Sequence, residues 1–223
     1  MSKSLFFNAI FKVTLGILLV GALIFWPAGT LAYPAGWLFM GVLFVPMLAG
    51  GFVLMAKNPA LLAKRLNAKE KMKGQDTVVK LSGLMFIAGF VVAGLDFRYG
   101  WYPLPIGASI GAAAVLLIAY LLYAEVLREN TYLSRTIEVQ EGQRVIDSGL
   151  YGIVRHPMYS ATLLLFLAMP LVLGSLIALP IFLLYIPIIV ARLLGEEKLL
   201  EAELPGYREY MKKVRWRLIP FVF

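Results

Sequence analysis

The stretch WLFMGVLFVPMLAGGFVLM, Trp37–Met55, contains no charged side chain over 19 consecutive positions. At ~1.5 Å per residue, a helix of this length nearly crosses the ~30 Å hydrocarbon core of a bilayer. Three comparable apolar runs accompany it, at Leu5–Trp26, Val78–Leu95 and Ile106–Val126. These four runs predict four transmembrane helices.

A fifth apolar block covers Ser160–Ala191 and is interrupted by Gly174-Ser175. Its two arms would be roughly 21–24 Å long as helices, which is short for a complete crossing. We therefore expect a tight helical hairpin over residues 160–191. The predicted fold class is all-α, a polytopic integral membrane helical bundle of four long spans and this C-terminal hairpin.

The composition limits the partners and cofactors that this chain can have. Of its 223 residues, 61% are apolar and 15% are charged, whereas a soluble domain has about 45–50% and 25%. The lipid bilayer is therefore the expected partner. The absence of cysteine excludes disulfides, thiolate zinc sites and iron–sulfur clusters, and a single histidine excludes a histidine-rich site. We expect no metal, and no nucleic acid despite the net charge of +8, because charge in membrane proteins acts through its placement.

The placement of charge predicts the topology. Twenty of the 21 basic residues fall on one side of the predicted spans, with Arg98 on the other, and Asp96 is the only one of 13 acidic residues on that other side. The positive-inside rule then predicts cytosolic N- and C-termini and an active site that faces the cytosol. We expect a single membrane domain, residues 1–223, with the four spans in 1–126 and the polar chemistry in 127–223.

Three weaker patterns lie between and within the spans. Gly107-x-x-x-Gly111 predicts close helix packing in the membrane. The basic stretch Asn58–Lys80 fits either an amphipathic surface helix or a plain positively charged anchor. Ile137 and Val139 alternate with polar residues, so a short hairpin or an extended loop is expected from residue 136 onward.

The segment GLYGIVRHPMY, Gly149–Tyr159, leads directly into the hairpin. Pro157 suits the first position of a helix and places His156 near its cap. Such a helix start offers unpaired N–H groups, to which Arg155 and His156 add donors, so a small anion such as a carboxylate would be held there. A lone histidine can equally be structural, and the residues leave both interpretations open.

A second motif, Arg192-x-x-x-Glu196-Glu197, follows the last apolar arm. On a helix, Arg192 and Glu196 are i,i+4 neighbours on one face. The pair fits an interfacial salt bridge, and it also fits a site that holds a cationic and an anionic group side by side. Beyond it, Val214–Pro220 is a short amphipathic tail that we expect to fold back onto the membrane face.

Taken together, these motifs resemble the isoprenylcysteine carboxyl methyltransferase family, whose broader group includes phospholipid N-methyltransferases. The matching residues are Gly149-x-Tyr151-x-x-Val154-Arg155-His156-Pro157-x-Tyr159, Arg192-x-x-x-Glu196-Glu197, Tyr207-x-x-Tyr210 and the ending Arg217-x-x-Pro220. The resemblance covers roughly residues 127–223. It implies that this part binds S-adenosylmethionine in a membrane-embedded pocket without a Rossmann domain and transfers its methyl group.

The resemblance also implies roles for single residues. Glu196 would face the ammonium or sulfonium end of the cofactor with Glu197 in support, and Arg192 would orient the acceptor by pairing with a carboxylate. Arg192 and Glu196 are thus the predicted catalytic residues. The predicted cofactor-binding residues are Gln143, Arg144, Val145, Ile146, Tyr151, Arg155, His156, Pro157, Met158, Tyr159, Glu196 and Glu197.

The expected function is therefore methylation of a lipid or lipid-tailed acceptor. A carboxylate, such as that of a prenylcysteine-type group, needs no general base, whereas an amine must lose a proton. The alternatives are a phospholipid N-methyltransferase, an NADPH-dependent sterol-type reductase of related fold and a non-catalytic lipid-binding protein. The reductases tend to follow the R-H-P-x-Y element with a glycine and an acidic residue, where this chain has Ser160-Ala161.

Overall fold

The computed structural model describes residues 3–66, 75–133 and 137–223, and this part of the chain is helical without a named strand. The helices are α1 (Lys3–Ala28), α2 (Pro34–Lys57), α3 (Pro59–Leu66), α4 (Gln75–Tyr99), α5 (Ile106–Glu129), α6 (Pro157–Val172), α7 (Leu179–Leu183), α8 (Tyr185–Glu203) and α9 (Tyr207–Lys213), with a 3₁₀ turn η1 at Gly149–Gly152. The four predicted spans are confirmed as α1, α2, α4 and α5. Each is three to seven residues longer than its apolar run predicts.

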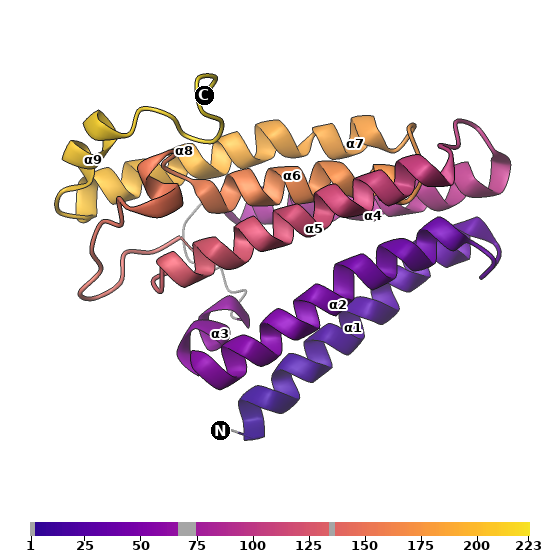
Figure 1. Ribbon diagram of the computed structural model, residues 1–223, viewed down its shortest axis with the longest axis horizontal. Helices are drawn as coiled ribbons and strands as arrows, with labels where there is room; N and C mark the ends of the chain where they lie inside the picture. The colour runs from indigo at the N-terminus through magenta and orange to yellow at the C-terminus, as the bar shows by residue number, and fades with distance from the viewer. Residues whose placement is uncertain (1–2, 67–74, 134–136) are drawn as a thin grey trace.

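The long helices run roughly along one axis (Figure 1). α5 packs along α6, α1 packs along α4, and α8 covers α4 and α6. Figure 1 shows both termini at the end of the molecule that also carries α3 and α9. The chain is thus a polytopic membrane helical bundle with its termini at one end, while the cytosolic location of that end stays a prediction.

Aromatic rings fill the centre of the bundle. Phe182 of α7 is fully buried against Phe86 and Phe90 of α4, and Phe86 also meets Phe166 of α6 edge to face. Gly89 lets this ring come close, because a β-carbon there would lie 2.4 Å from a ring atom of Phe182. The contact joins α4 to the C-terminal helices that bear the polar motifs.

The predicted hairpin is confirmed in its first arm and in its break, but its second arm is longer than predicted. The chain does break at Gly174, where φ is 73°, and α6 is a short apolar helix of 16 residues. However, α7 and α8 together run from Leu179 to Glu203, which is 25 residues and long enough to cross a membrane. The prediction of a short second arm was wrong, because it ended the helix where the apolar run ends, whereas α8 continues through the charged residues that follow.

One weaker prediction also fails. Gly107 and Gly111 are exposed, and a β-carbon at either would meet nothing within 4 Å, so they make no close helix contact within the described part of the chain. The packing face of α5 is formed by Ala112, Leu116 and Ala119 instead.

Within the basic stretch Asn58–Lys80, the described residues form the short helix α3 and the first turns of α4. The predicted surface residues Lys69, Lys71, Met72 and Lys73, and also Arg135 and Thr136, lie outside the described residues. From Ile137 to Ser148 the chain is a loop with a turn at Glu141-Gly142, so the extended-loop alternative holds there.

Candidate active site

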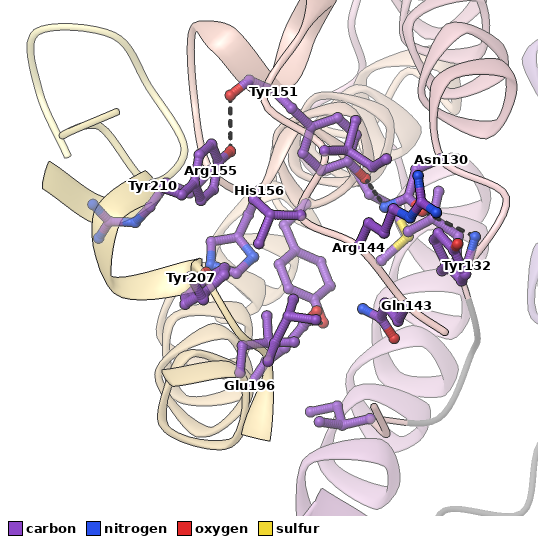
Figure 2. Close-up of a pocket in the computed structure, with 18 of the residues that line it drawn as sticks. Asn130, Tyr132, Gln143, Arg144, Tyr151, Arg155, His156, Glu196, Tyr207 and Tyr210 are labelled. Atoms are coloured by element: carbon purple, nitrogen blue, oxygen red, sulfur yellow. Dashed lines mark hydrogen bonds between the residues drawn. The ribbon is translucent and has the colours of Figure 1, made fainter. Parts of the chain in front are cut away.

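A cavity opens at the end of the bundle that carries both termini. It encloses about 830 Å³ of space between protein atoms, a figure that includes the open solvent at its mouth. Figure 2 shows His156 and Glu196 between α9 on one side and the loop with Gln143 and Arg144 on the other. The cavity is lined by Asn130, Tyr132, Leu133, Ile137, Glu138, Gln143, Arg144, Val145, Ile146, Tyr151, Arg155, His156, Met158, Tyr159, Arg192, Glu196, Leu200, Leu204, Tyr207 and Tyr210.

The start of α6 forms the centre of this site. His156 is the N-cap residue and Pro157 is the first helical residue, as the sequence predicts. The backbone N–H groups of Arg155 and His156 donate to the carbonyls of Trp216 and Arg217, at 2.8 and 2.9 Å. These two groups are therefore already paired. They precede the first turn of α6, whose N–H groups the sequence analysis expects to hold an anion, so that expectation stays a prediction. The tail does fold back, as expected, but onto this helix start.

Glu197 is buried behind the cavity wall and binds the residues that shape it. Its Oε1 accepts from Arg155 Nε at 2.7 Å and lies 3.2 Å from His156 Nε2. Its Oε2 accepts from Arg217 Nε of the tail at 2.9 Å. A buried carboxylate with such partners has its charge compensated and its lone pairs occupied. Glu197 therefore orients His156 and fastens the tail, and it does not line the cavity.

Glu196 and Arg192, by contrast, both face the cavity from α8. Their common face confirms the helical spacing of the motif. The hydroxyl of Tyr159 donates to Oε2 of Glu196, and the guanidinium of Arg192 also interacts with this hydroxyl. The middle of α8 thus presents a carboxylate and a guanidinium to the cavity, next to the Tyr159 hydroxyl from the first turn of α6.

Tyrosine rings make up much of the wall. Tyr151 accepts a hydrogen bond from Asn130 at 3.0 Å, and Tyr210 donates to the backbone carbonyl of Tyr151 at 2.8 Å (Figure 2). Burial raises the pKa of the hydroxyls of Tyr151, Tyr207 and Tyr210 above the usual value, so these rings stay neutral. The faces of neutral tyrosine rings attract cations.

Tyr207 stands out among them. Its hydroxyl is buried, and among the described residues it has no hydrogen-bond partner. A buried hydroxyl without a partner is costly, so its persistence at a cavity wall indicates a place for a polar ligand atom.

The loop before η1 supplies the opposite wall. Gln143, Arg144, Val145 and Ile146 line the cavity, where the resemblance placed them. Gln143 anchors the turn, since its N–H donates to the carbonyl of Gln140 at 3.0 Å and its side-chain Oε1 accepts from the Gln140 N–H at 2.9 Å.

Of the predicted cofactor-binding residues, Pro157 and Glu197 do not line the cavity. The sequence reasoning also gave no role to several residues that do. Tyr207 and Tyr210 were noticed only as part of a motif, although their i,i+3 spacing on a short helix signals a common face. Nothing local marks the residues between α5 and the loop, which are Asn130, Tyr132, Leu133, Ile137 and Glu138.

The described residues, 3–66, 75–133 and 137–223, contain no group of three or more His, Asp or Glu side chains that would hold a metal ion. The cavity lining contains Arg144, Arg155 and Arg192 together with Glu138 and Glu196, and the guanidinium of Arg155 is bound by Glu197. The two remaining positive charges, on Arg144 and Arg192, equal in number the negative charges of the two carboxylates. Such a lining suits a ligand that carries charges of both signs.

Two of the matches to known proteins bear on the function of this chain. Residues 106–204, which run from the start of α5 to just past α8, match the family model of the phospholipid methyltransferases. The chain is also similar to the Delta(14)-sterol reductase TM7SF2 of Mus musculus, with 27% identity over 201 residues. This match covers 79% of the chain and 46% of the mouse protein, so the chain spans about half the length of that relative.

Proposed function

We propose that the protein is a membrane methyltransferase that uses S-adenosylmethionine and acts on a lipid-tailed acceptor, most simply by O-methylation of a carboxylate. The observation that carries this proposal is the pair Arg192 and Glu196 on one face of α8, beside the Tyr159 hydroxyl, in a cavity with tyrosine walls. The match of residues 106–204 to the phospholipid methyltransferase model supports the reaction class.

The lining fits this cofactor. S-adenosylmethionine carries two positive groups, a sulfonium and an ammonium, and one carboxylate. The neutral tyrosine rings and the two carboxylates of the cavity suit the positive groups, and arginine suits the carboxylate. Glu196 would hold the ammonium or sulfonium end, while Gln143–Ile146 and Tyr151 would hold the rest. The unpartnered hydroxyl of Tyr207 would receive a polar atom of the ligand.

When bound, S-adenosylmethionine supplies a methyl group on a positively charged sulfur, and its transfer to a carboxylate oxygen releases no proton. The chain then has to position the two reactants and exclude water, which can provide most of the rate. Arg192 would align the acceptor by pairing with its carboxylate in a two-pronged contact.

An amine acceptor would need a base, and the arrangement of His156 argues against one here. Nε2 of His156 lies against Oε1 of Glu197, which is itself bonded to Arg155 and Arg217. A ring nitrogen held in this way does not point at a substrate. Phospholipid N-methylation is therefore the second candidate. It is suggested by the matching family model, which describes phospholipid methyltransferases.

The similarity to a mouse sterol reductase makes an NADPH-dependent reductase the third candidate. NADPH carries several phosphate charges, which proteins bind with a surplus of arginine and lysine. The balanced charges of this cavity do not offer that surplus. A lipid-binding protein without catalysis is the fourth candidate and is separated from the others by turnover.

Calorimetric titration of the purified protein in a nonionic detergent tests the cofactor. We expect S-adenosylhomocysteine to bind and to raise the melting temperature, because a ligand selective for the folded state stabilises it by about 2.7 kcal/mol at 100 times its Kd. NADPH is expected to do neither. Binding of NADPH together with no binding of S-adenosylhomocysteine would replace this proposal with the reductase.

Substitution on α8 locates the ligand. Glu196→Ala is expected to weaken S-adenosylhomocysteine about 10- to 150-fold, the range of a charge-assisted contact. Glu201→Ala is the matched control, because Glu201 lies on the same helix, is well exposed and pairs with Arg208 at 3.2 Å. Equal affinity in the two variants would remove Glu196 from the site.

A further inference from the structure

The short helix α3 places a cation from the N-terminal half of the chain beside the cavity. α3 is fixed to the bundle by the buried side chains of Leu61 and Leu62, and its first turn is capped by Asn58, whose Oδ1 accepts from the Leu61 N–H at 3.0 Å. Its far end is tied to α1, since Lys12 Nζ donates to the carbonyl of Leu66 at 2.5 Å. Lys64 also donates to Gln140 of the cavity loop. The helix is therefore held in place against this site.

Arg65 is the residue that reaches the cavity wall from α3. Its Nη1 lies 3.6 Å from the sulfur of Met158, and Met158 lines the cavity between His156 and Tyr159. Its guanidinium lies 5.4 Å from the centre of the Tyr123 ring on α5 and donates to the hydroxyl of that tyrosine. This guanidinium is half-buried and bound on two sides, so its position is fixed before a ligand binds.

Arg65 and Arg192 contact neighbouring residues at the start of α6. Arg65 lies against Met158, and the guanidinium of Arg192 interacts with the hydroxyl of Tyr159. Met158 and Tyr159 both line the cavity, and Tyr159 donates to Glu196. The two guanidinium groups thus reach the same two-residue stretch of the cavity wall.

We propose that Arg65 and Arg192 together bind the anionic head group of a lipid-tailed acceptor, and that Arg65 is its specificity-determining residue. This proposal rests on the proposed function and names its acceptor class: an amphipathic molecule with a carboxylate or a phosphate at membrane-surface depth. A guanidinium group can donate two parallel hydrogen bonds to a carboxylate or phosphate, and here two such groups reach neighbouring residues of the cavity wall.

The position of Arg65 in the chain bears on its role. The match to the phospholipid methyltransferase model covers residues 106–204, so α3 lies outside it. The lining residues of the cavity therefore come from the matched segment except for Tyr207 and Tyr210, whereas Arg65 comes from the N-terminal half. A residue that selects the acceptor is expected outside the matched segment, because acceptors differ between enzymes that share a cofactor.

Equilibrium binding in nonionic detergent tests the proposal with three probes. N-acetyl-S-farnesylcysteine carries a carboxylate, its methyl ester is the uncharged match, and dioleoylphosphatidylethanolamine carries a phosphate. We expect the wild type to prefer the acid to the ester, or else to bind the phosphate lipid. Arg65→Ala is expected to weaken the preferred anionic probe about 10- to 150-fold and to leave the ester unchanged, and Arg65→Lys should restore only part of the loss.

Two controls separate this role from a structural one. Lys57→Ala removes an exposed positive charge from the end of α2, beside α3, so it reports a general loss of attraction to anions. S-adenosylhomocysteine affinity should stay at the wild-type value in Arg65→Ala. A loss that affects acid and ester equally, or wild-type affinity of Arg65→Ala for both anionic probes, would overturn the proposal. If the wild type fails to bind S-adenosylhomocysteine, the proposed function fails instead.

Discussion

Among the described residues, each end of the bundle has one buried carboxylate, and the two carboxylates are hydrogen-bonded in opposite ways. Asp96, at the end away from the termini, accepts from the Tyr102 N–H at 2.8 Å and from the Ser175 hydroxyl at 2.5 Å, both of which are neutral donors. Glu197, at the end with the cavity, binds Arg155, Arg217 and His156. Both are almost fully buried, with 1% and 4% exposure.

The difference reflects what each end has to do. Around Asp96, two short connections close on each other, as shown by the Leu104 N–H that donates to the Gly174 carbonyl at 2.8 Å. Around Glu197, a long loop, α9 and the C-terminal tail leave a cavity open. Neutral donors suffice to seal a compact end, whereas charged donors hold a distant tail in place and still leave a polar wall. The following predictions test this contrast, from the largest effect to the smallest.

Glu197→Ala should have the largest effect, about 3–5 kcal/mol of unfolding free energy, because it leaves Arg155 buried without its counter-charge. Thermal unfolding in detergent measures it, and Glu197→Gln should retain part of the stability by keeping acceptor and shape. A wild-type melting temperature for Glu197→Ala would show that the charged network does not hold the tail.

Arg192→Ala should lower methyl transfer about 10- to 150-fold while S-adenosylhomocysteine affinity stays nearly intact, because it removes a charge-assisted contact with the acceptor alone. Turnover and binding are measured side by side, with Arg192→Lys giving partial rescue at most. A plain surface pair with Glu196 would be worth only about 0.3–0.5 kcal/mol, and full activity in Arg192→Ala would favour that simpler interpretation.

Asp96→Ala should cost about 1–3 kcal/mol, because it leaves the Ser175 hydroxyl or the Tyr102 N–H without its acceptor. This variant should lose less stability than Glu197→Ala and should bind S-adenosylhomocysteine with wild-type affinity. If Asp96→Ala weakened the binding of S-adenosylhomocysteine as well as lowering stability, the two ends of the bundle would be coupled.

Tyr207→Phe should have the smallest effect on the free protein, because the hydroxyl that it removes has no hydrogen-bond partner among the described residues. The melting temperature without ligand should stay the same or rise slightly. S-adenosylhomocysteine affinity should fall by a few fold, which corresponds to a neutral hydrogen bond of about 0.5–1.5 kcal/mol. Unchanged affinity would show that the ligand does not reach this hydroxyl.

The helix starts and apolar spans were predictable because their determinants are local. About 20 apolar residues in a row identify a span whatever surrounds them, and Pro157 identifies a helix start from its fixed φ angle. The same local reasoning misjudged α8, because a helix that packs on others can continue through charged residues. It also misjudged Gly107 and Gly111, since small residues permit close packing without requiring a partner.

The amino-acid sequence by itself therefore determined the membrane class, the four long spans, the break at Gly174 and the common face of Arg192 and Glu196. Only the tertiary structure decided that Glu197 turns away from the cavity, that the tail pairs with the start of α6, and that Arg65 reaches Met158. These contacts join residues 42 positions apart for Arg155 and Glu197 and 93 positions apart for Arg65 and Met158. Periodicity and capping act over a few residues, so contacts across such separations arise only when the packed helices bring the segments together.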